Sequence, residues 1–387
     1  MIKVDIIIPS LISYQKYPIY KKLDKYLLFQ KFAFPSWSGN WFPVWLHLRE
    51  LKKMGIKIRF INYLNLKHTK IQKTVIFDSR ILNNLIFKYD NVHKTLSNEI
   101  IPLLQSLRKR VEDLIFFDNA DSTGNLHFEV FPYVNRYFKK QLLKDRSLYR
   151  RPLIGKRLFT DFYAKNYNLD HTHEKFDKIS LPSKFEAKLG VSWNFALKDY
   201  RYSDLLRRFI YGFIKRNNLN FHIPKKYRKI ILSANYTIKS SNQLVYFQRN
   251  QLLNILKQMY SSVPQISIGK IPKRAYLNTL KSSKAVVSPF GWGEICYRDF
   301  ETYLAGAALI KPRLEHLDTW PNIYKEYKTY IPLPWEIESW REKIPEILED
   351  EKNLYDVAMQ GQLAFRNIWK KKGVYNFCSH FLNIVSP

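Results

Sequence analysis

The residues best suited to chemistry lie together in a glycine-containing stretch in the last third of the chain. Glu294, Arg298 and Glu301 are spaced so that, on a helix, their side chains share one face. Gly291 and Gly293 come directly before them and allow the backbone to turn tightly and to approach a ligand. The free N–H groups at the start of such a helix favour an anion, above all a phosphate.

Local signals predict the elements that would position these side chains. Residues 284–289 form a short apolar run closed by a breaker, which predicts a buried strand. A helix is predicted from about Glu294, and Gly306 is well placed to end it. Residues 307–312 are apolar again and predict a second strand. The order strand, glycine loop, helix and strand predicts a βαβ crossover.

The charged face of this helix has two explanations. In a ligand site, its carboxylates accept hydrogen bonds from sugar or ribose hydroxyls, and the planar guanidinium of Arg298 binds a pyrophosphate. In a surface ladder, the same residues form ion pairs three and four positions apart. The glycine loop in front of the helix favours the ligand site.

The sequences FGWGE, at residues 290–294, and RDFETYLAG, at residues 298–306, resemble the donor-binding region of GT-B glycosyltransferases. The resemblance is narrower to the retaining, paired-glutamate (group 1-like) enzymes of bacterial surface polysaccharide synthesis. It implies that Glu301 contacts the ribose and that Glu294 lies near the donor sugar. In the family the two glutamates are one residue further apart, so that Gly293 occupies the usual first position.

The resemblance implies an α/β fold of two Rossmann-like domains that face a cleft, with a C-terminal helix that crosses back to the N-terminal domain. Residues 1–185 are expected to form the acceptor-side domain, residues 186–355 the nucleotide-sugar-binding domain, and residues 356–387 the returning helices. The expected reaction transfers a hexosyl or related group from a nucleotide-sugar to a glycan or lipid-linked glycan acceptor, with retention of configuration. Neither a metal nor a cofactor besides the donor substrate is expected.

The predicted donor site extends beyond the helix. In the resembled family, the loop and helix after the first strand of the C-terminal domain supply basic residues to the diphosphate. Arg249 stands there in this sequence, although an exposed arginine explains it equally well. We predict catalytic roles for Glu294 and Arg298, and donor binding by Glu301, Gly291, Gly293, Arg249, Ser288 and Tyr297.

Two loops of the N-terminal half are predicted to line the acceptor side. One contains Gly39, Asn40 and Trp41, and the other contains Asp121, directly after an apolar strand. Ligands of open α/β sheets collect at the carboxyl ends of the strands. A structural loop with packing tryptophans, and polar residues that simply end strands in solvent, remain equally open explanations. Asp118 and Asp121 do not have the Asp-x-Asp spacing of metal-dependent glycosyltransferases, so no metal site is predicted.

The formal charge of +31 implies an anionic partner, which could be nucleic acid, an acidic membrane surface or a phosphorylated substrate. Residues 136–157 hold nine Lys and Arg, interleaved with aromatic and apolar residues, and one acidic residue. Such a segment suits single-stranded nucleic acid, an anionic lipid surface or a solvated face. We favour the membrane surface, because an enzyme that acts on lipid-linked acceptors would need one.

Two cysteines, Cys296 and Cys378, provide neither a disulfide framework nor a set of metal ligands, which fits the cytoplasm. No signal peptide or membrane-spanning run is recognised, so we expect a cytoplasmic protein with peripheral contact to the inner face of the membrane. A basic nucleic-acid-binding protein is the alternative, although the charge is spread over the whole chain and no binding motif stands out. A metal-dependent GT-A glycosyltransferase is a second alternative.

Overall fold

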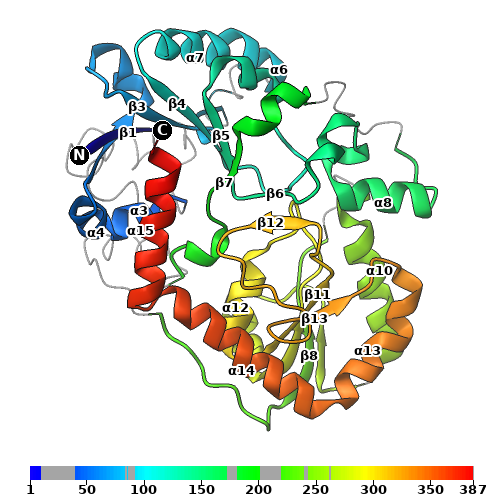
Figure 1. Cartoon of the computed structure of the whole chain (residues 1–387). Coiled ribbons are helices and arrows are strands. Elements are labelled where there is room, and N and C mark those ends of the chain that lie inside the picture. The colour runs from blue at the N-terminus through cyan, green and yellow to red at the C-terminus, as the bar shows by residue number, and fades with distance from the viewer. Residues whose placement is uncertain are drawn as a thin grey trace.

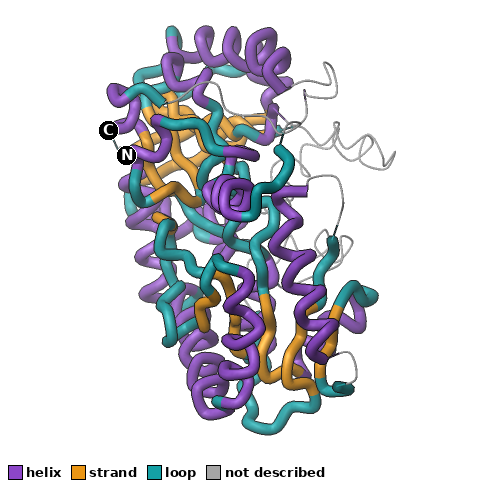
Figure 2. Tube along the Cα trace, turned by 90° about the vertical axis from the view of Figure 1, so that its right-hand side faces the viewer, coloured by secondary structure: helices purple, strands orange, loops and turns teal. Residues whose placement is uncertain are grey.

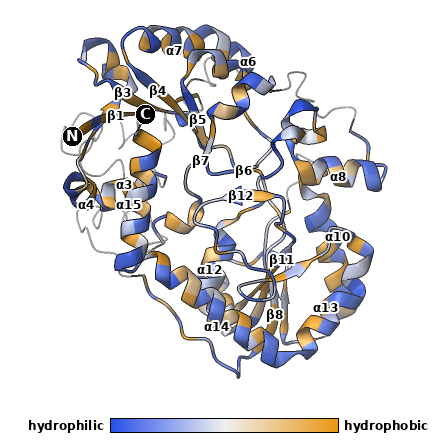
Figure 3. Cartoon of the chain, viewed as in Figure 1, coloured by the Kyte–Doolittle hydropathy of each residue, from blue (hydrophilic) through white to orange (hydrophobic). Residues whose placement is uncertain are grey.

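The computed structural model describes residues 1–9, 40–82, 85, 92–171, 181–200, 219–238, 243–260 and 263–386. These residues form two α/β halves, one above the other in Figure 1. Figure 2 shows the molecule from the side, with strands in both halves and helices around them. In Figure 3 the strands are largely hydrophobic, whereas most helices alternate between hydrophobic and hydrophilic residues, as helices that cover a core do.

Runs of β-branched and aromatic residues form the sheet of the first half. Its strands are β1 (Ile2–Ile8), β2 (Ile56–Asn62), β3 (Thr74–Asp78), β4 (Asp113–Asp118), β5 (Arg136–Lys139) and β7 (Leu189–Val191). They lie in the order β2-β1-β3-β4-β5-β7, and every neighbouring pair is parallel. In β1, Val4 and Ile6 belong to the core on one face and Ile7 to the core on the other, so both faces are covered.

Helices cover both faces of this sheet. They are α3 (Phe42–Leu46), α4 (Leu48–Lys53), α6 (Val92–Thr95) and α7 (Ile101–Arg108). Leu104 and Leu107 of α7 pack in one core, whereas Val44 and Leu51 of α3 and α4 pack in the other. Most residues of both cores are fully buried, so both faces of the sheet are covered at its centre, whereas Lys57 and Arg59 of the edge strand β2 are exposed.

The second half contains the predicted βαβ unit. Its strands are β8 (Ile230–Ala234), β9 (Ile266–Ile268), β10 (Ser283–Val287), β11 (Ala308–Pro312) and β13 (Ile331–Leu333), in the parallel order β13-β11-β10-β8-β9. Its helices are α10 (Gln243–Tyr260), α11 (Lys273–Ser282), α12 (Tyr297–Ala305), α13 (Trp340–Glu349) and α14 (Glu351–Ile368). β10, α12 and β11 form the crossover that the sequence predicts, with Ala285 opposite Ala308.

The bounds of α12 differ from the prediction at one end. Gly306 ends the helix with a φ of 68°, in the left-handed region, as predicted. The helix begins at Tyr297 rather than at about Glu294, because the backbone N–H of Cys296 donates to the carboxylate of Asp299, 3.1 Å away, and caps the first turn there.

Several secondary-structure elements join the halves. β6 (Gln141–Leu143) and β12 (Leu317–Thr319) pair as a two-stranded antiparallel sheet between them (Figure 1). α8 (Leu158–Asn166) packs Phe159 and Tyr163 into the core of the second half. α15 (Lys371–Val385) crosses back and packs Phe377 against the first sheet, which confirms the predicted returning helix. Among the described residues, no helix is both long enough and apolar enough to span a bilayer.

The first sheet continues past the boundary predicted after residue 185. β7 pairs in parallel with β5, so residues 189–191 belong to the first half. α8, which precedes this strand in the chain, packs on the second half instead. The chain therefore passes between the halves more than once before the second sheet begins.

Candidate active site

Two arginine side chains converge at the start of α12. Arg298 comes from the first turn of α12 and Arg249 from α10. Their guanidinium carbons lie 5.3 and 5.9 Å from the ring centroid of Tyr236, which follows β8. Burial lowers the pKa of Arg249, and the positive charge of Arg298 lowers it further. Two like charges held this close repel each other unless an anion balances them.

Arg298 has buried hydrogen-bond donors that no described residue satisfies. Its Nε and Nη1 are buried and have no partner among the described residues. Burial lowers the pKa of Arg298, but Tyr276, Cys296 and Glu301 together raise it by more, so the side chain stays cationic. A buried donor left unpaired costs about 1–3 kcal/mol, and more when it is charged. The two N–H groups therefore fit the oxygen atoms of an anionic ligand.

Gly291 permits the close contact between Arg249 and the glycine loop. The Nε of Arg249 donates to the carbonyl of Phe290 at 2.6 Å, and its Nη1 donates to the carbonyl of Thr237 at 3.1 Å. A Cβ at position 291 would lie 2.5 Å from the Nη2 of Arg249. The sequence predicts a glycine here for close approach to a ligand, and in the structure the group that approaches is this guanidinium.

Glu301 lies in the next turn of α12. The hydroxyl of Tyr276 donates to its Oε2 at 2.9 Å, which fixes the carboxylate on the side of α11. Glu301 and Tyr297 also line a cavity of about 340 Å³ between α11 and α12. Tyr297 is 43% exposed, and Lys198 lies 3.3 Å above its ring. Arg298 thus lies close to both Arg249 and Glu301, and Tyr297 lies at the rim of this cavity. That these residues bind a donor stays a prediction.

Ser288, which is predicted to bind the donor, is buried and bonds to another side chain of the protein. It is fully buried, and its Oγ donates to Asp299 Oδ1 at 2.5 Å. Lys311, also fully buried, donates to the same carboxylate at 3.3 Å and pairs with its other oxygen at 3.2 Å. These bonds tie β10, β11 and α12 together under the loop. Sequence reasoning missed this network, although a lone lysine in an apolar strand signals a buried partner.

Glu294 bridges the two halves. It is fully buried, and its carboxylate accepts hydrogen bonds from Thr123 Oγ1 at 2.6 Å and from Gln141 Nε2 at 2.9 Å. Burial raises its pKa, but His316, 3.8 Å away, and the bonds from Thr123 lower it by more. The predicted contact with donor hydroxyls is therefore corrected, because the carboxylate is occupied at the domain interface.

Gly293 allows the two halves to touch through their backbones. A Cβ at this position would lie 1.8 Å from the carbonyl oxygen of Asp121. The side chain of Asp121 pairs with Lys140 at 2.8 Å, and its carbonyl accepts from Gln141. Asp121 and Trp292 also line a second cavity, of about 430 Å³, at the carboxyl ends of β3 and β4. Asp121 thus lies where an acceptor-side residue is predicted.

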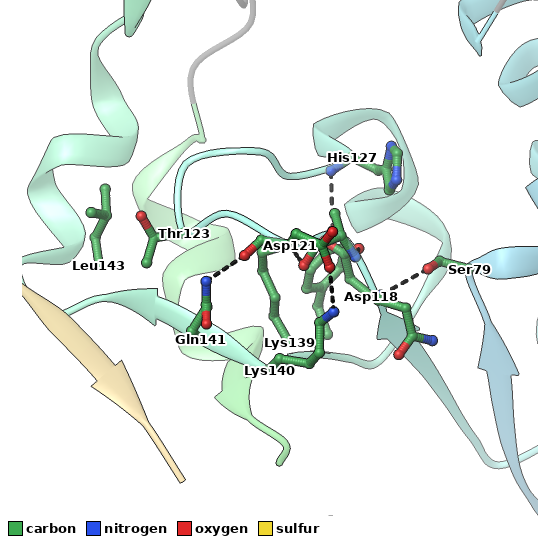
Figure 4. A network of polar contacts seen from close by, with 12 residues as sticks. Ser79, Asp118, Asp121, Thr123, His127, Lys139, Lys140, Gln141 and Leu143 are labelled. Carbon is green, nitrogen blue, oxygen red and sulfur yellow. Dashed lines mark hydrogen bonds and ion pairs between the residues drawn. The ribbon is translucent and has the colours of Figure 1, made fainter. Parts of the chain in front are cut away.

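Figure 4 shows the buried polar network behind this cavity. The Oδ2 of Asp118 accepts from Lys139 Nζ at 2.9 Å and from the hydroxyl of Tyr137 at 2.7 Å. Lys139 and Asp118 are both fully buried. Burial raises the pKa of Asp118, but the charge of Lys139 is the main effect that lowers it below its usual value. The pair is self-contained and positions the loop that carries Asp121.

The first acceptor-side loop is internal where it is described. Trp41 is fully buried, and its Nε1 donates to Asp78 Oδ2 at 2.6 Å. Asn40 donates to the side chain of Asn119 and accepts from Trp193 Nε1 at 2.7 Å. These contacts correct the prediction that Trp41 faces an acceptor. Gly39 lies outside the described residues.

The basic segment at residues 136–157 is largely neutralised within the fold. Six of its nine cationic side chains form an ion pair with a carboxylate: Arg136 with Asp113, Lys139 with Asp118, Lys140 with Asp121, Arg146 with Asp318, Arg150 with Glu186 and Arg151 with Asp161. Lys139 and Lys140 are also buried. The segment therefore does not form the continuous cationic face that the sequence suggests.

Within the part of the chain that the structure describes, no group of three or more His, Cys, Asp or Glu side chains converges as metal ligands would.

Two Rossmann-like halves with parallel sheets, joined by a returning C-terminal helix, make up the architecture. This is the GT-B arrangement that the sequence predicts.

No protein-family model matches the sequence, and the comparison with curated proteins finds no match. Solved structures are similar in fold. TarM of S. aureus is 9% identical with a TM-score of 0.44, over 84% of this chain and 57% of that chain. A chain of the GtfA/B complex is 10% identical with a TM-score of 0.37. The match covers 82% of this chain and 60% of that chain.

The sucrose-phosphate synthase of Thermosynechococcus elongatus is similar over its full length. It is 9% identical with a TM-score of 0.43, and the match covers 99% of this chain and 98% of that one. At these identities and TM-scores the likeness concerns the fold alone, and the roles of residues rest on the contacts described above.

Proposed function

We propose that this chain is a glycosyltransferase that uses a nucleotide-sugar donor. One observation carries the proposal: the buried Nε and Nη1 of Arg298 have no partner among the described residues, beside Arg249 and at the N-terminus of α12. A diphosphate supplies the negative charge and the oxygen atoms that this arrangement requires. In a nucleotide-sugar, the diphosphate joins the nucleoside to the sugar that is transferred.

In the proposed reaction, the bond between the anomeric carbon and the diphosphate oxygen breaks, and its electron pair stays on the diphosphate. Arg298, Arg249 and the N-terminus of α12 stabilise this charge as it grows. The acceptor hydroxyl oxygen forms the new glycosidic bond to the anomeric carbon, and the hydroxyl proton passes to an oxygen of the departing diphosphate. Glu301, held by Tyr276, accepts hydrogen bonds from the ribose hydroxyls.

The finer parts of the proposal follow the family resemblance. They are retention of configuration, independence of metal and of further cofactors, a glycan or lipid-linked glycan acceptor in surface polysaccharide synthesis, and action at the cytoplasmic face of a membrane. Glu294 has a different role in the proposal. Its bonds to Thr123 and Gln141 make it a residue that positions the two domains.

A thermal-shift screen with UDP, GDP, ADP, dTDP and CMP tests the donor site. A ligand that binds only the folded state raises Tm. At a ligand concentration of 100 Kd, it stabilises the folded state by about 2.7 kcal/mol. We expect a rise with one nucleotide, lost in Arg298→Gln and in Glu301→Ala. It should persist in Arg341→Gln, which removes an exposed arginine of α13.

The proposal fails if no nucleotide raises Tm, or if Arg298→Gln leaves the rise intact. Tight oligonucleotide binding at physiological salt, without any nucleotide effect, would instead support a nucleic-acid-binding protein.

A further inference from the structure

Trp292 is an exposed aromatic residue in an otherwise buried loop. Its side chain is 48% exposed, whereas Gly291 and Gly293 on either side are buried. Exposing a large aromatic ring forgoes the free energy of burying it. Single exposed aromatic residues are common on protein surfaces, so the contacts and the surroundings of Trp292 decide what its ring can do.

Both halves of the molecule hold Trp292 in place. The Nε of Arg157 donates to the Trp292 carbonyl at 2.8 Å, and its guanidinium carbon lies 5.3 Å from the ring. On the other side, Tyr246 of α10 contacts the ring edge to face, with centroids 6.1 Å apart. The backbone contact between Gly293 and Asp121 fixes the next residue. The ring is therefore positioned before any ligand binds, which lowers the cost of binding.

Trp292 lines the cavity of about 430 Å³, together with described residues between Ser79 and Arg157. The size is that of a small-molecule site. Polar side chains with both donors and acceptors line it, including Ser79, Asn119, Asp121, Asn125, His127 and Glu129. Figure 4 shows how Asp121 and His127 lie at this end of the sheet. The cavity thus combines one aromatic face with many hydrogen-bonding groups.

This combination matches the chemistry of a saccharide. A pyranose ring has an apolar C–H face that packs on an aromatic ring, and hydroxyls around its edge that donate and accept hydrogen bonds. Trp292 also follows Gly291, which contacts the Arg249 guanidinium. Resting on the function proposed above, we propose that Trp292 is the stacking platform for the acceptor sugar and determines which saccharide the enzyme accepts. The acceptor then lies on one side of the glycine loop and the donor diphosphate on the other.

Saturation-transfer NMR tests this with the methyl glycosides of glucose, galactose, mannose, rhamnose and N-acetylglucosamine, with and without the nucleotide that gives the largest thermal shift. We expect at least one glycoside to bind. Binding should weaken roughly tenfold in Trp292→Ala, which removes the ring, and persist in Trp292→Phe, which keeps an aromatic face for the apolar face of the sugar. Tyr375→Ala, which removes an exposed tyrosine of α15, should change nothing.

The nucleotide shift separates the two proposals. The proposed stacking role of Trp292 fails if a nucleotide binds but no glycoside does, or if Trp292→Ala leaves glycoside binding intact. In both cases the proposed donor site is unaffected. If Trp292→Ala instead abolishes the nucleotide shift, the ring stacks on a nucleobase, which also overturns the platform. If no nucleotide binds while glycoside binding depends on Trp292, the glycosyltransferase proposal fails and the saccharide site remains.

Discussion

Two cationic regions of this molecule differ in how their charges are balanced. In the segment at residues 136–157, six basic side chains pair with carboxylates, and the pair of Lys139 and Asp118 is fully buried. At the start of α12, Arg249 and Arg298 lie together, and two nitrogens of Arg298 have no partner among the described residues. The first region stabilises the fold. The second is the region that we propose binds an anion, which the described residues do not supply.

The comparison shows that local density of Lys and Arg does not identify a binding site. A dense run of cations is neutralised when the fold brings carboxylates to it, as Asp318 from β12 reaches Arg146. The anion site that we propose is formed instead by two arginines that are distant in sequence. Their burial and mutual repulsion mean that a bound anion would stabilise them more than it would an exposed, paired cation.

The largest expected difference between the regions concerns stability. Lys139→Met should lower the free energy of unfolding by about 3–5 kcal/mol, because it leaves Asp118 buried without its cation. Arg298→Gln should change it by less than about 1 kcal/mol, because no carboxylate hydrogen bond is lost. Urea denaturation of the two variants checks this. Equal destabilisation by both would remove the distinction between the regions.

Acid should weaken the paired region and the domain bridge. The pKa values of Asp118 and Glu294 lie below their ordinary values despite burial, because of Lys139 for the first, and of His316 and Thr123 for the second. Their stabilising effect is therefore complete above the unfolded pKa values of about 4 and is lost as the pH falls below them. Urea denaturation at a series of pH values measures this loss.

Glu294→Gln should reduce the acid-dependent loss, whereas Glu342→Gln, on the exposed face of α13, should leave it unchanged. An identical pH dependence in wild type and Glu294→Gln would contradict the role of the bridge.

The smallest expected effect on stability concerns an exposed ion pair of the basic segment. Arg150 pairs with Glu186 at 2.7 Å, and the arginine side chain is 53% exposed. Arg150→Ala should cost no more than about 1 kcal/mol in the same assay, since exposed pairs are weak. A cost as large as that of Lys139→Met would show that burial does not separate the pairs within this segment.

Sequence reasoning succeeded where the signals were local. The crossover from β10 to β11 and the end of α12 at Gly306 follow from hydrophobic runs and a glycine cap, which need no distant partner. Helical periodicity singled out Arg298 and the resemblance added Arg249, and the structure brings both to Tyr236.

Sequence reasoning failed where the partner lies far along the chain. Glu294 bonds to Thr123, 171 residues away, and no periodicity signals that contact. Trp41 was predicted to face an acceptor because it lies in a glycine-containing loop, but its hydrogen bond to Asp78 anchors it in the core. Trp292 was passed over because its exposure depends on how the two halves meet.

The returning helix α15 has a consequence for the order in which the protein matures during synthesis. Phe377 and Phe381 lie in the same core as Val4 and Ile6 of β1. β1, which precedes the other described strands and helices in the chain, is therefore covered by α15, which follows all of them. Until residues 371–385 emerge, the half that is made first keeps an apolar face uncovered, so the chaperones that bind nascent chains should recognise it for longer than the second half.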